Sequence, residues 1–252
     1  MSAYAASLHN EWCKLMKRKK YWVFLIIGLC FCLLWALLGR FASNLISNAG
    51  GFFIDLTPTP MGVLPFFLQI MVPFLMFMGV TDLITVEGAE HTMKAMLVRP
   101  VERWKLYAAK ITAVVLYAAL YLICVFACSV ALHLTLGTGV VSGDIFIALG
   151  SYALTLIPLA ILACFAAFVA LLGRSGTLTM FILLLCYLAL SVLPVIFPAL
   201  TEVLFTSYLG WYKLWIGALP GAKKLIHMLL IVLGYGVTFF MAGSLLFDRK
   251  EY

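Results

Sequence analysis

Charged residues are scarce in this sequence: Asp, Glu, Lys and Arg make up 11% of its 252 residues, and only 10 residues are acidic. A soluble domain is usually about a quarter charged and about half apolar, whereas 65% of this chain is hydrophobic. The excess indicates contact with lipid rather than a larger core. The net charge of +7 does not indicate nucleic-acid binding, because the basic residues lie just outside hydrophobic runs, where they orient a membrane protein.

The sequence also lacks the motif Gly-x-x-x-x-Gly-Lys-Ser/Thr, which forms the phosphate-binding loop of many ATPases. We therefore expect the chain to bind no ATP by itself in that manner. No series of acidic residues runs through the hydrophobic segments, so a relay of protons or sodium ions is not indicated.

Neither the cysteines nor the histidines form a recognisable site. Six of the seven cysteines lie inside apolar runs, which is typical of small buried hydrophobic residues rather than of a disulfide framework. Gly173-Arg174-Ser175-Gly176 resembles the Gly-x-Ser-Gly of intramembrane serine proteases, with His227 as the candidate base. Ser175 and His227 are predicted at opposite membrane faces, about 30 Å apart, too far for a hydrogen bond. We expect no catalytic residue, no bound cofactor and no metal site.

Six apolar runs are long enough, or nearly so, to cross a bilayer, which takes about 17–25 helical residues. The sequence therefore predicts an all-α, polytopic membrane protein with six transmembrane helices in a single domain, 1–252. Several prolines fall within the runs, which is tolerated where neighbouring helices satisfy the freed carbonyls. The runs are Tyr21–Leu38, Val63–Val80, Ile111–Leu136, Ile145–Leu172, Leu178–Phe197 and Leu225–Phe247.

Residues 2–20 are predicted to form an amphipathic helix in the membrane interface. Tyr4, Leu8, Trp12 and Leu15 recur at helical spacing, and basic residues occupy other positions. A basic amphipathic helix that carries a Trp is typical of the headgroup boundary. A solvated basic tail is the alternative.

Lys and Arg are distributed unequally between the two sides that six spans define: 13 fall on the side of the termini and 4 on the other. This bias places both termini in the cytoplasm. It also makes residues 87–105, the longest polar interruption, cytoplasmic. Within this stretch Thr92 to Val98 is predicted to form a short helix, which Pro100 ends before a new helix starts near Val101. The two helices would form a docking surface at the membrane edge.

The connection 198–224 is external by the same count, yet it is rich in aromatic residues. These are Phe205, Tyr208, Trp211, Tyr212 and Trp215. Such residues often anchor at the lipid headgroups. We expect one or two short helices that dip into the outer leaflet and are broken by Gly210 and Pro220. An ordinary external loop is the alternative.

The cytoplasmic stretch carries a run of spaced residues that begins at Glu87-Gly88. The run continues with Thr92-Met93-Lys94, Leu97, Arg99-Pro100-Val101-x-Arg103 and Lys110. It resembles the signature of ABC-2 type exporter permeases, which is close to E-x-x-x-G-T-L-x-x-L-L-x-x-P-V-x-R, with a Lys opening the third span. The chain departs from it at Glu90 and His91, where a Gly often precedes the Thr. The N-terminal helix, the six spans and the aromatic connection extend the resemblance over nearly the whole chain.

The resemblance implies the transmembrane half of an ATP-binding cassette exporter, which is not itself an enzyme, in the plasma membrane of a bacterium. It would work as a dimer with an identical or related permease. Two copies of a separate ATP-binding subunit, which hold the ATP and Mg, would dock beneath it. The residues implied in coupling to that subunit are Glu87, Glu90, His91, Thr92, Lys94, Leu97, Arg99, Pro100 and Arg103.

The resemblance also implies a substrate path between the two permease copies, lined mainly by the first, second and fifth spans. The lack of charged lining favours a hydrophobic or amphipathic substrate over an ion or a sugar. Small permeases of this kind often serve the export of antibiotic peptides or immunity to them.

A different class of function stays open at this point. A small, basic, six-span protein is also what the substrate-binding subunit of a vitamin-uptake complex, or a structural membrane protein, looks like. The long charged stretch after the second span argues against both. Co-purification separates the classes, because an exporter permease should bring down an ATPase and a second permease.

The predicted orientation can be tested by cysteine labelling from outside the cell. In a chain cleared of reactive native cysteines, Asp55→Cys should react with a membrane-impermeant maleimide, and Lys94→Cys should react only after permeabilisation. Strong labelling of position 94 in intact cells would overturn the topology.

Overall fold

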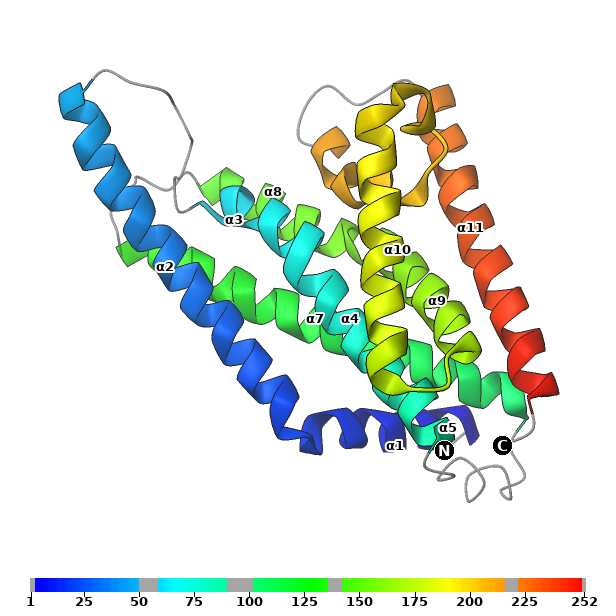
Figure 1. Cartoon of the computed structure of the whole chain (residues 1–252). Coiled ribbons are helices and arrows are strands. Elements are labelled where there is room, and N and C mark those ends of the chain that lie inside the picture. Colours follow the sequence, from blue (N-terminus) through cyan, green and yellow to red (C-terminus); the bar gives the residue numbers. More distant parts are fainter. Residues whose placement is uncertain (1–2, 50–58, 90–101, 136–141, 216–221, 251–252) are drawn as a thin grey trace.

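The computed structural model describes residues 3–49, 59–89, 102–135, 142–215 and 222–250, which form helices and no strand. The predicted all-α class is confirmed. In Figure 1 the long helices lean against one another, and both chain ends lie at the same end of the molecule. The α-helices are α1 (Ala3–Lys17), α2 (Lys19–Ala49), α3 (Pro60–Phe66), α4 (Val72–Val80), α5 (Glu87–Ala89), α7 (Arg103–Thr135), α8 (Ser142–Leu154), α9 (Leu156–Leu172), α10 (Gly176–Ile196) and α11 (Ala222–Arg249). The other elements are two π-helical segments, η1 (Phe67–Met71) and η2 (Thr81–Val86), and two 3-10 segments, η3 (Pro198–Leu200) and η4 (Phe205–Trp215).

Six of the described helical stretches are long and apolar enough to cross a membrane, as the sequence predicts. The second joins α3, η1, α4, η2 and α5 into one continuous stretch, and the fourth joins α8 and α9. The stretches are Lys19–Phe41, Pro60–Ala89, Arg103–Thr135, Ile145–Leu172, Gly176–Ile196 and Ile226–Arg249.

Two of the prolines within the spans, Pro73 and Pro158, are accommodated in different ways. Pro73 has no amide hydrogen to donate to the carbonyl of Gln69, and the hydroxyl of Tyr187 on α10 donates to that oxygen instead, at 2.8 Å. Pro158 cannot donate to Leu154, and α8 ends at that residue. A neighbouring helix therefore satisfies one freed carbonyl, as expected, while the other proline coincides with a break.

The central helix of the described structure is α7, which α1, α2, α4, α9 and α11 all contact. Two of its tyrosines fill spaces left by glycines on neighbouring helices. The hydroxyl of Tyr121 lies where a Cβ of Gly28 on α2 would be, and the hydroxyl of Tyr107 lies where a Cβ of Gly243 on α11 would be. Both rings are fully buried. Small residues thus bring two helices close to α7, as is common in membrane proteins.

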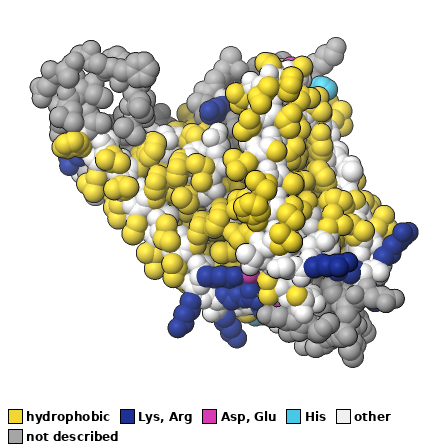
Figure 2. Space-filling view, viewed as in Figure 1, with side chains coloured by type: hydrophobic (Ala, Val, Ile, Leu, Met, Phe, Trp, Pro, Cys, Tyr) yellow, Lys and Arg dark blue, Asp and Glu magenta, His cyan; other side chains and the backbone are white. Residues whose placement is uncertain are grey.

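The surface has the pattern of a membrane-embedded protein. Figure 2 shows hydrophobic side chains over most of this face and Lys and Arg side chains gathered along its lower edge, near the end that holds the termini. Exposed apolar side chains are frequent on α2, α10 and α11, for example Ile26, Phe181 and Leu230. These three helices present their apolar faces outward to lipid or to another membrane protein.

The aromatic connection packs against neighbouring helices. Helix η4 contacts α8, α9, α10 and α11, and it continues through Gly210, where a break was predicted. The four aromatic side chains that the structure describes are largely buried among these helices, and the position of the connection at the headgroup level stays a prediction. The four side chains are Phe205, Tyr208, Trp211 and Tyr212. Pro220 and the side chain of Trp215 lie outside the described residues.

The two glycine contacts predict a stability difference between similar substitutions. Gly28→Ala and Gly243→Ala should each destabilise the protein by about 1–3 kcal/mol, because the added methyl group overlaps an enclosed tyrosine ring. Gly234→Ala is the matched control, since Gly234 is also on α11 and a Cβ there meets no atom within 4 Å. Thermal unfolding in detergent measures the effect, and equal midpoints for all three variants would contradict the packing.

Candidate functional site

Helix α1 lies across the end of the bundle that holds both termini and packs on α7 (Figure 1). The apolar stripe of α1 forms the contact with α7, as the helical spacing predicts. Leu15 is fully buried, and the centroid of the Trp12 ring lies 6.4 Å from that of the Tyr117 ring on α7. The hydroxyl of Tyr4 is hydrogen-bonded to that of Thr112, at 2.7 Å. The N-terminal helix is therefore fixed to the third span along its length.

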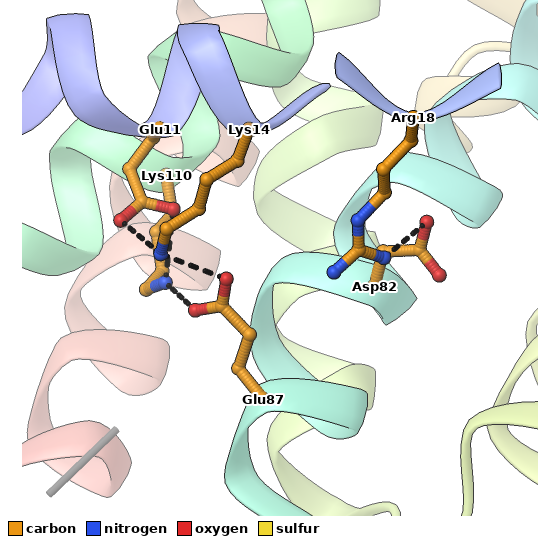
Figure 3. A network of polar contacts seen from close by, with 6 residues as sticks. All are labelled: Glu11, Lys14, Arg18, Asp82, Glu87 and Lys110. Atoms are coloured by element: carbon orange, nitrogen blue, oxygen red, sulfur yellow. Dashed lines mark hydrogen bonds and ion pairs between the residues drawn. The ribbon is translucent and has the colours of Figure 1, made fainter. Parts of the chain in front are cut away.

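Glu11 lies on the same buried face of α1 and is fully enclosed. Its carboxylate contacts Lys110 of α7 at 3.1 Å and Lys14 at 3.1 Å. Glu87, at the end of the second span, contacts the same two lysines, Lys110 at 2.6 Å and Lys14 at 2.8 Å. Figure 3 shows the four side chains converging from three elements. We refer to Glu11, Lys14, Glu87 and Lys110 as the charge ring.

The charge ring is largely sealed from solvent. The side chains of Glu11, Lys110 and Glu87 are 0%, 1% and 6% exposed, and that of Lys14 is 26% exposed. A buried ion is costly unless opposite charges and hydrogen bonds compensate it. Here two carboxylates meet two ammonium groups, so the ring is neutral as a unit. Removal of any one member would leave an uncompensated charge inside.

A second ionic cluster holds the junction between α1 and α2. Asp82 is buried on the π-helical segment η2, and its carboxylate accepts a hydrogen bond from the Tyr21 hydroxyl at 2.7 Å. Arg18, the residue between the two helices, contacts the same carboxylate at 2.9 Å (Figure 3), and Lys20 also contacts it. A π-helical turn takes in an extra residue and often marks a functional position. Together the two clusters fix the C-terminal half of α1 and the start of α2 to the second span.

The sequence predicted a coupling site around Glu87, and the structure places only part of it. Glu87 belongs to the charge ring, and Arg103 begins α7, where its guanidinium donates to the backbone oxygen of Asp248 at 2.7 Å, near the end of α11. The other residues of that prediction lie outside the described part of the chain. These are Glu90, His91, Thr92, Lys94, Leu97, Arg99 and Pro100.

The sequence did not predict that three other side chains join Glu87 in the charge ring. Glu11 was not singled out, although it follows Leu8 by three residues and precedes Leu15 by four, which places it on the apolar face. Lys14 was assigned to the polar face of α1. Lys110 was noted only as the lysine that opens the third span. The position of Glu11 within an apolar helical stripe was the sequence feature that could have indicated a buried charge.

The remaining candidates from the sequence do not assemble into a site. Ser175 directly precedes α10, and His227 lies in the second turn of α11. These starts of α10 and α11 are at opposite ends of the molecule in Figure 1, so the protease-like pair is separated, as predicted. Among the residues that the structure describes, no three His, Cys, Asp or Glu side chains gather as metal ligands would.

Comparison with known families decides the identity. Residues 7–191 match the family described as "ABC-2 family transporter protein", a match that includes the whole charge ring. The chain belongs to this family. No curated protein matches the chain significantly. As an ABC-2 transporter protein, it is the membrane component of an ABC transporter, has no ATP site of its own, and belongs to a group that works with a separate ATP-binding subunit.

The charge ring of this ABC-2 protein predicts a strong effect of removing one lysine. Lys110→Met should cost about 3–5 kcal/mol of folding free energy, because Glu11 and Glu87 then share a single ammonium group. Lys105→Met, on the same helix, should cost less than about 1 kcal/mol, since Lys105 is partly exposed and its described contacts are the exposed Glu102 and the exposed ring of Trp104. Thermal unfolding of the purified protein in detergent compares them.

The double variant Lys110→Met with Glu87→Gln supplies the check on this interpretation. It removes one charge of each sign, so it should recover part of the stability that Lys110→Met loses. If Lys110→Met unfolds at the same temperature as Lys105→Met, the ring does not support the fold.

Proposed function

We propose that this protein is the transmembrane subunit of an ABC exporter that moves a hydrophobic or amphipathic substrate, such as a peptide or an antibiotic, out of the cytoplasm or membrane. Hydrolysis of ATP with Mg by two copies of a separate ATP-binding subunit drives the transport. A second permease copy, identical or related, completes the assembly. The subunit lies in the plasma membrane of a bacterium with both termini in the cytoplasm.

The observation that carries the proposal is the anchoring of both ends of the segment 90–101. Before it, Glu87 is held by Lys14 and Lys110 in the charge ring. After it, Arg103 is held by the backbone of Asp248 at the end of α11. If the ATP-binding subunit moves this segment, the two anchors transmit the movement to the helices on either side of it.

The anchors define which helices would respond to the ATP-binding subunit. The ring joins α1, the end of the second span and α7, and the Asp82 cluster joins the same span to the start of α2. We assign docking to Glu90, His91, Thr92, Lys94, Leu97, Arg99 and Pro100. Glu87 and Arg103 would act as fixed ends that position these residues.

The character of the exposed helices supports an apolar or amphipathic substrate. The first and fifth spans, α2 and α10, carry outward side chains such as Val23, Leu34, Leu185 and Leu188. A path between two copies lined by these helices would offer little to an ion or a sugar. It would suit a ligand that itself partitions into a membrane.

The coupling role is tested by the double variant Glu90→Ala with Arg99→Ala. Loss of one partner of a desolvated interface charge pair can cost about 2–5 kcal/mol, so capture of the ATP-binding subunit should weaken or hydrolysis should become uncoupled from export. The six spans should still insert, because none of their residues is changed. Co-purification of the ATPase and substrate-stimulated hydrolysis in reconstituted vesicles are the measurements.

Arg174→Ala is the control, because Arg174 is exposed in the loop between α9 and α10, at the same end of the molecule but outside the segment. It should leave both measurements unchanged. If the double variant also captures the ATPase and exports substrate at the normal rate, the segment is not the coupling element. Co-purification without any ATPase would instead favour a structural role or an uptake subunit.

A further inference from the structure

A pocket of about 540 Å³ lies at the end of the molecule remote from both termini. Its walls come from the residues around η4 and from the second turn of α11, where His227 and Met228 lie. The volume is within the range of about 300–1,000 Å³ that is usual for small-molecule sites. The pocket follows the region that matches the ABC-2 family, which ends at residue 191.

The pocket brings together one acid and one base that are not paired. Glu202 and Lys213 both line it, and both are exposed enough for a ligand to reach them. Within the described part of the chain, neither forms an ion pair with the other or with a third residue. Two opposite charges that face one cavity without meeting each other are matched by a ligand that carries both charges.

Aromatic rings border the acidic side of the pocket. Tyr208 and Trp211 line it, and the Tyr208 hydroxyl donates to the backbone oxygen of Glu202, which fixes the ring beside that residue. Burial and the nearby Glu202 carboxylate raise the pKa of Tyr208 above its usual value, so the phenol stays neutral. A carboxylate next to aromatic faces is a favourable environment for an ammonium group.

His227 also lines the pocket and has ring nitrogens that can donate a hydrogen bond to an anion. Together with the Lys213 ammonium it provides donors of the kind that a phosphate group needs.

The setting of the pocket indicates an amphipathic ligand. The sixth span begins at Ile226, so His227 lies at the boundary of the apolar part of the molecule. Val203 and Ile226, the sequence neighbours of Glu202 and His227, are exposed apolar side chains. A ligand with charges of both signs in the pocket and an apolar remainder would bury these side chains as well.

We propose that this pocket binds the headgroup of a zwitterionic phospholipid, with its ammonium group at Glu202 and the aromatic rings and its phosphate at Lys213 and His227. The apolar chains of the lipid lie along Val203 and Ile226. This assignment is independent of the transported substrate and of the coupling segment, because α5 and the start of α7, which flank that segment, lie at the other end of the molecule.

The experiment is lipid binding to the purified full-length chain, measured by native mass spectrometry with dioleoyl phosphatidylethanolamine and dioleoyl phosphatidylglycerol at equal concentration. The wild type should retain the zwitterionic lipid about fivefold over the anionic one. Glu202→Gln should bring this ratio to about one, because the ammonium group loses its carboxylate. Lys213→Gln should weaken the retention of both lipids about fivefold, because both contain the phosphate.

Glu102→Gln and Lys105→Gln are matched controls, since this exposed acid–base pair lies at the opposite end of the molecule. They should leave the lipid ratio unchanged. An unchanged ratio in Glu202→Gln, or a Lys213→Gln protein that behaves like Lys105→Gln, would overturn the proposal. Soluble glycerophosphoethanolamine is a phosphodiester and supplies the same charges without the chains, and displacement of the lipid by an equal concentration of it would overturn the lipid assignment.

Discussion

The constraint on which this structure depends is that polar groups inside a membrane protein must find partners within the protein, because lipid offers none. The carbonyl of Gln69, which Pro73 leaves without an amide donor, is served by Tyr187 from another helix. The four charges of the charge ring are served by one another. In both cases at least one partner comes from a different element, so satisfying the polar group also decides which helices are neighbours.

The charge ring and the apolar contacts of α1 contribute differently to the fold. The stripe of Leu15 and Trp12 attaches α1 to α7, but apolar packing tolerates sliding better than an ionic contact does. The ring requires Glu11, Glu87 and Lys110 to meet within hydrogen-bond distance. It thereby sets the position of α1 along α7 and places the end of the second span beside both. The contacts that form the candidate site therefore also determine how these three elements pack.

Composition and periodicity were sufficient to predict the six spans and the separate N-terminal helix, because a long apolar run has few other structures available to it. The same information could not place the aromatic connection. Tyr and Trp suit both a headgroup layer and a packed interior, since each has an apolar ring and one polar group. In this protein they pack against the neighbouring helices, and only the tertiary structure shows those contacts.

The site was predicted in part for a similar reason. Glu87 stood out as a charge at the end of an apolar run, but its partners lie 73 residues earlier, at Lys14, and 23 residues later, at Lys110. No local pattern connects positions so far apart. Glu11 carried a local signal, its place within an apolar stripe. Such a position indicates that the Glu11 side chain is buried, but it does not indicate which residues neutralise its charge.

The separation of the ring members along the chain has a consequence for synthesis. Glu11 leaves the ribosome long before Lys110, which lies 99 residues further on. Until the third span has been made, the enclosed site that α1 occupies does not exist, and the Glu11 carboxylate has to stay in water. The first helix to be translated therefore reaches its final position only after the third span has been made, and the position of the N-terminal helix reports whether the first three spans have assembled.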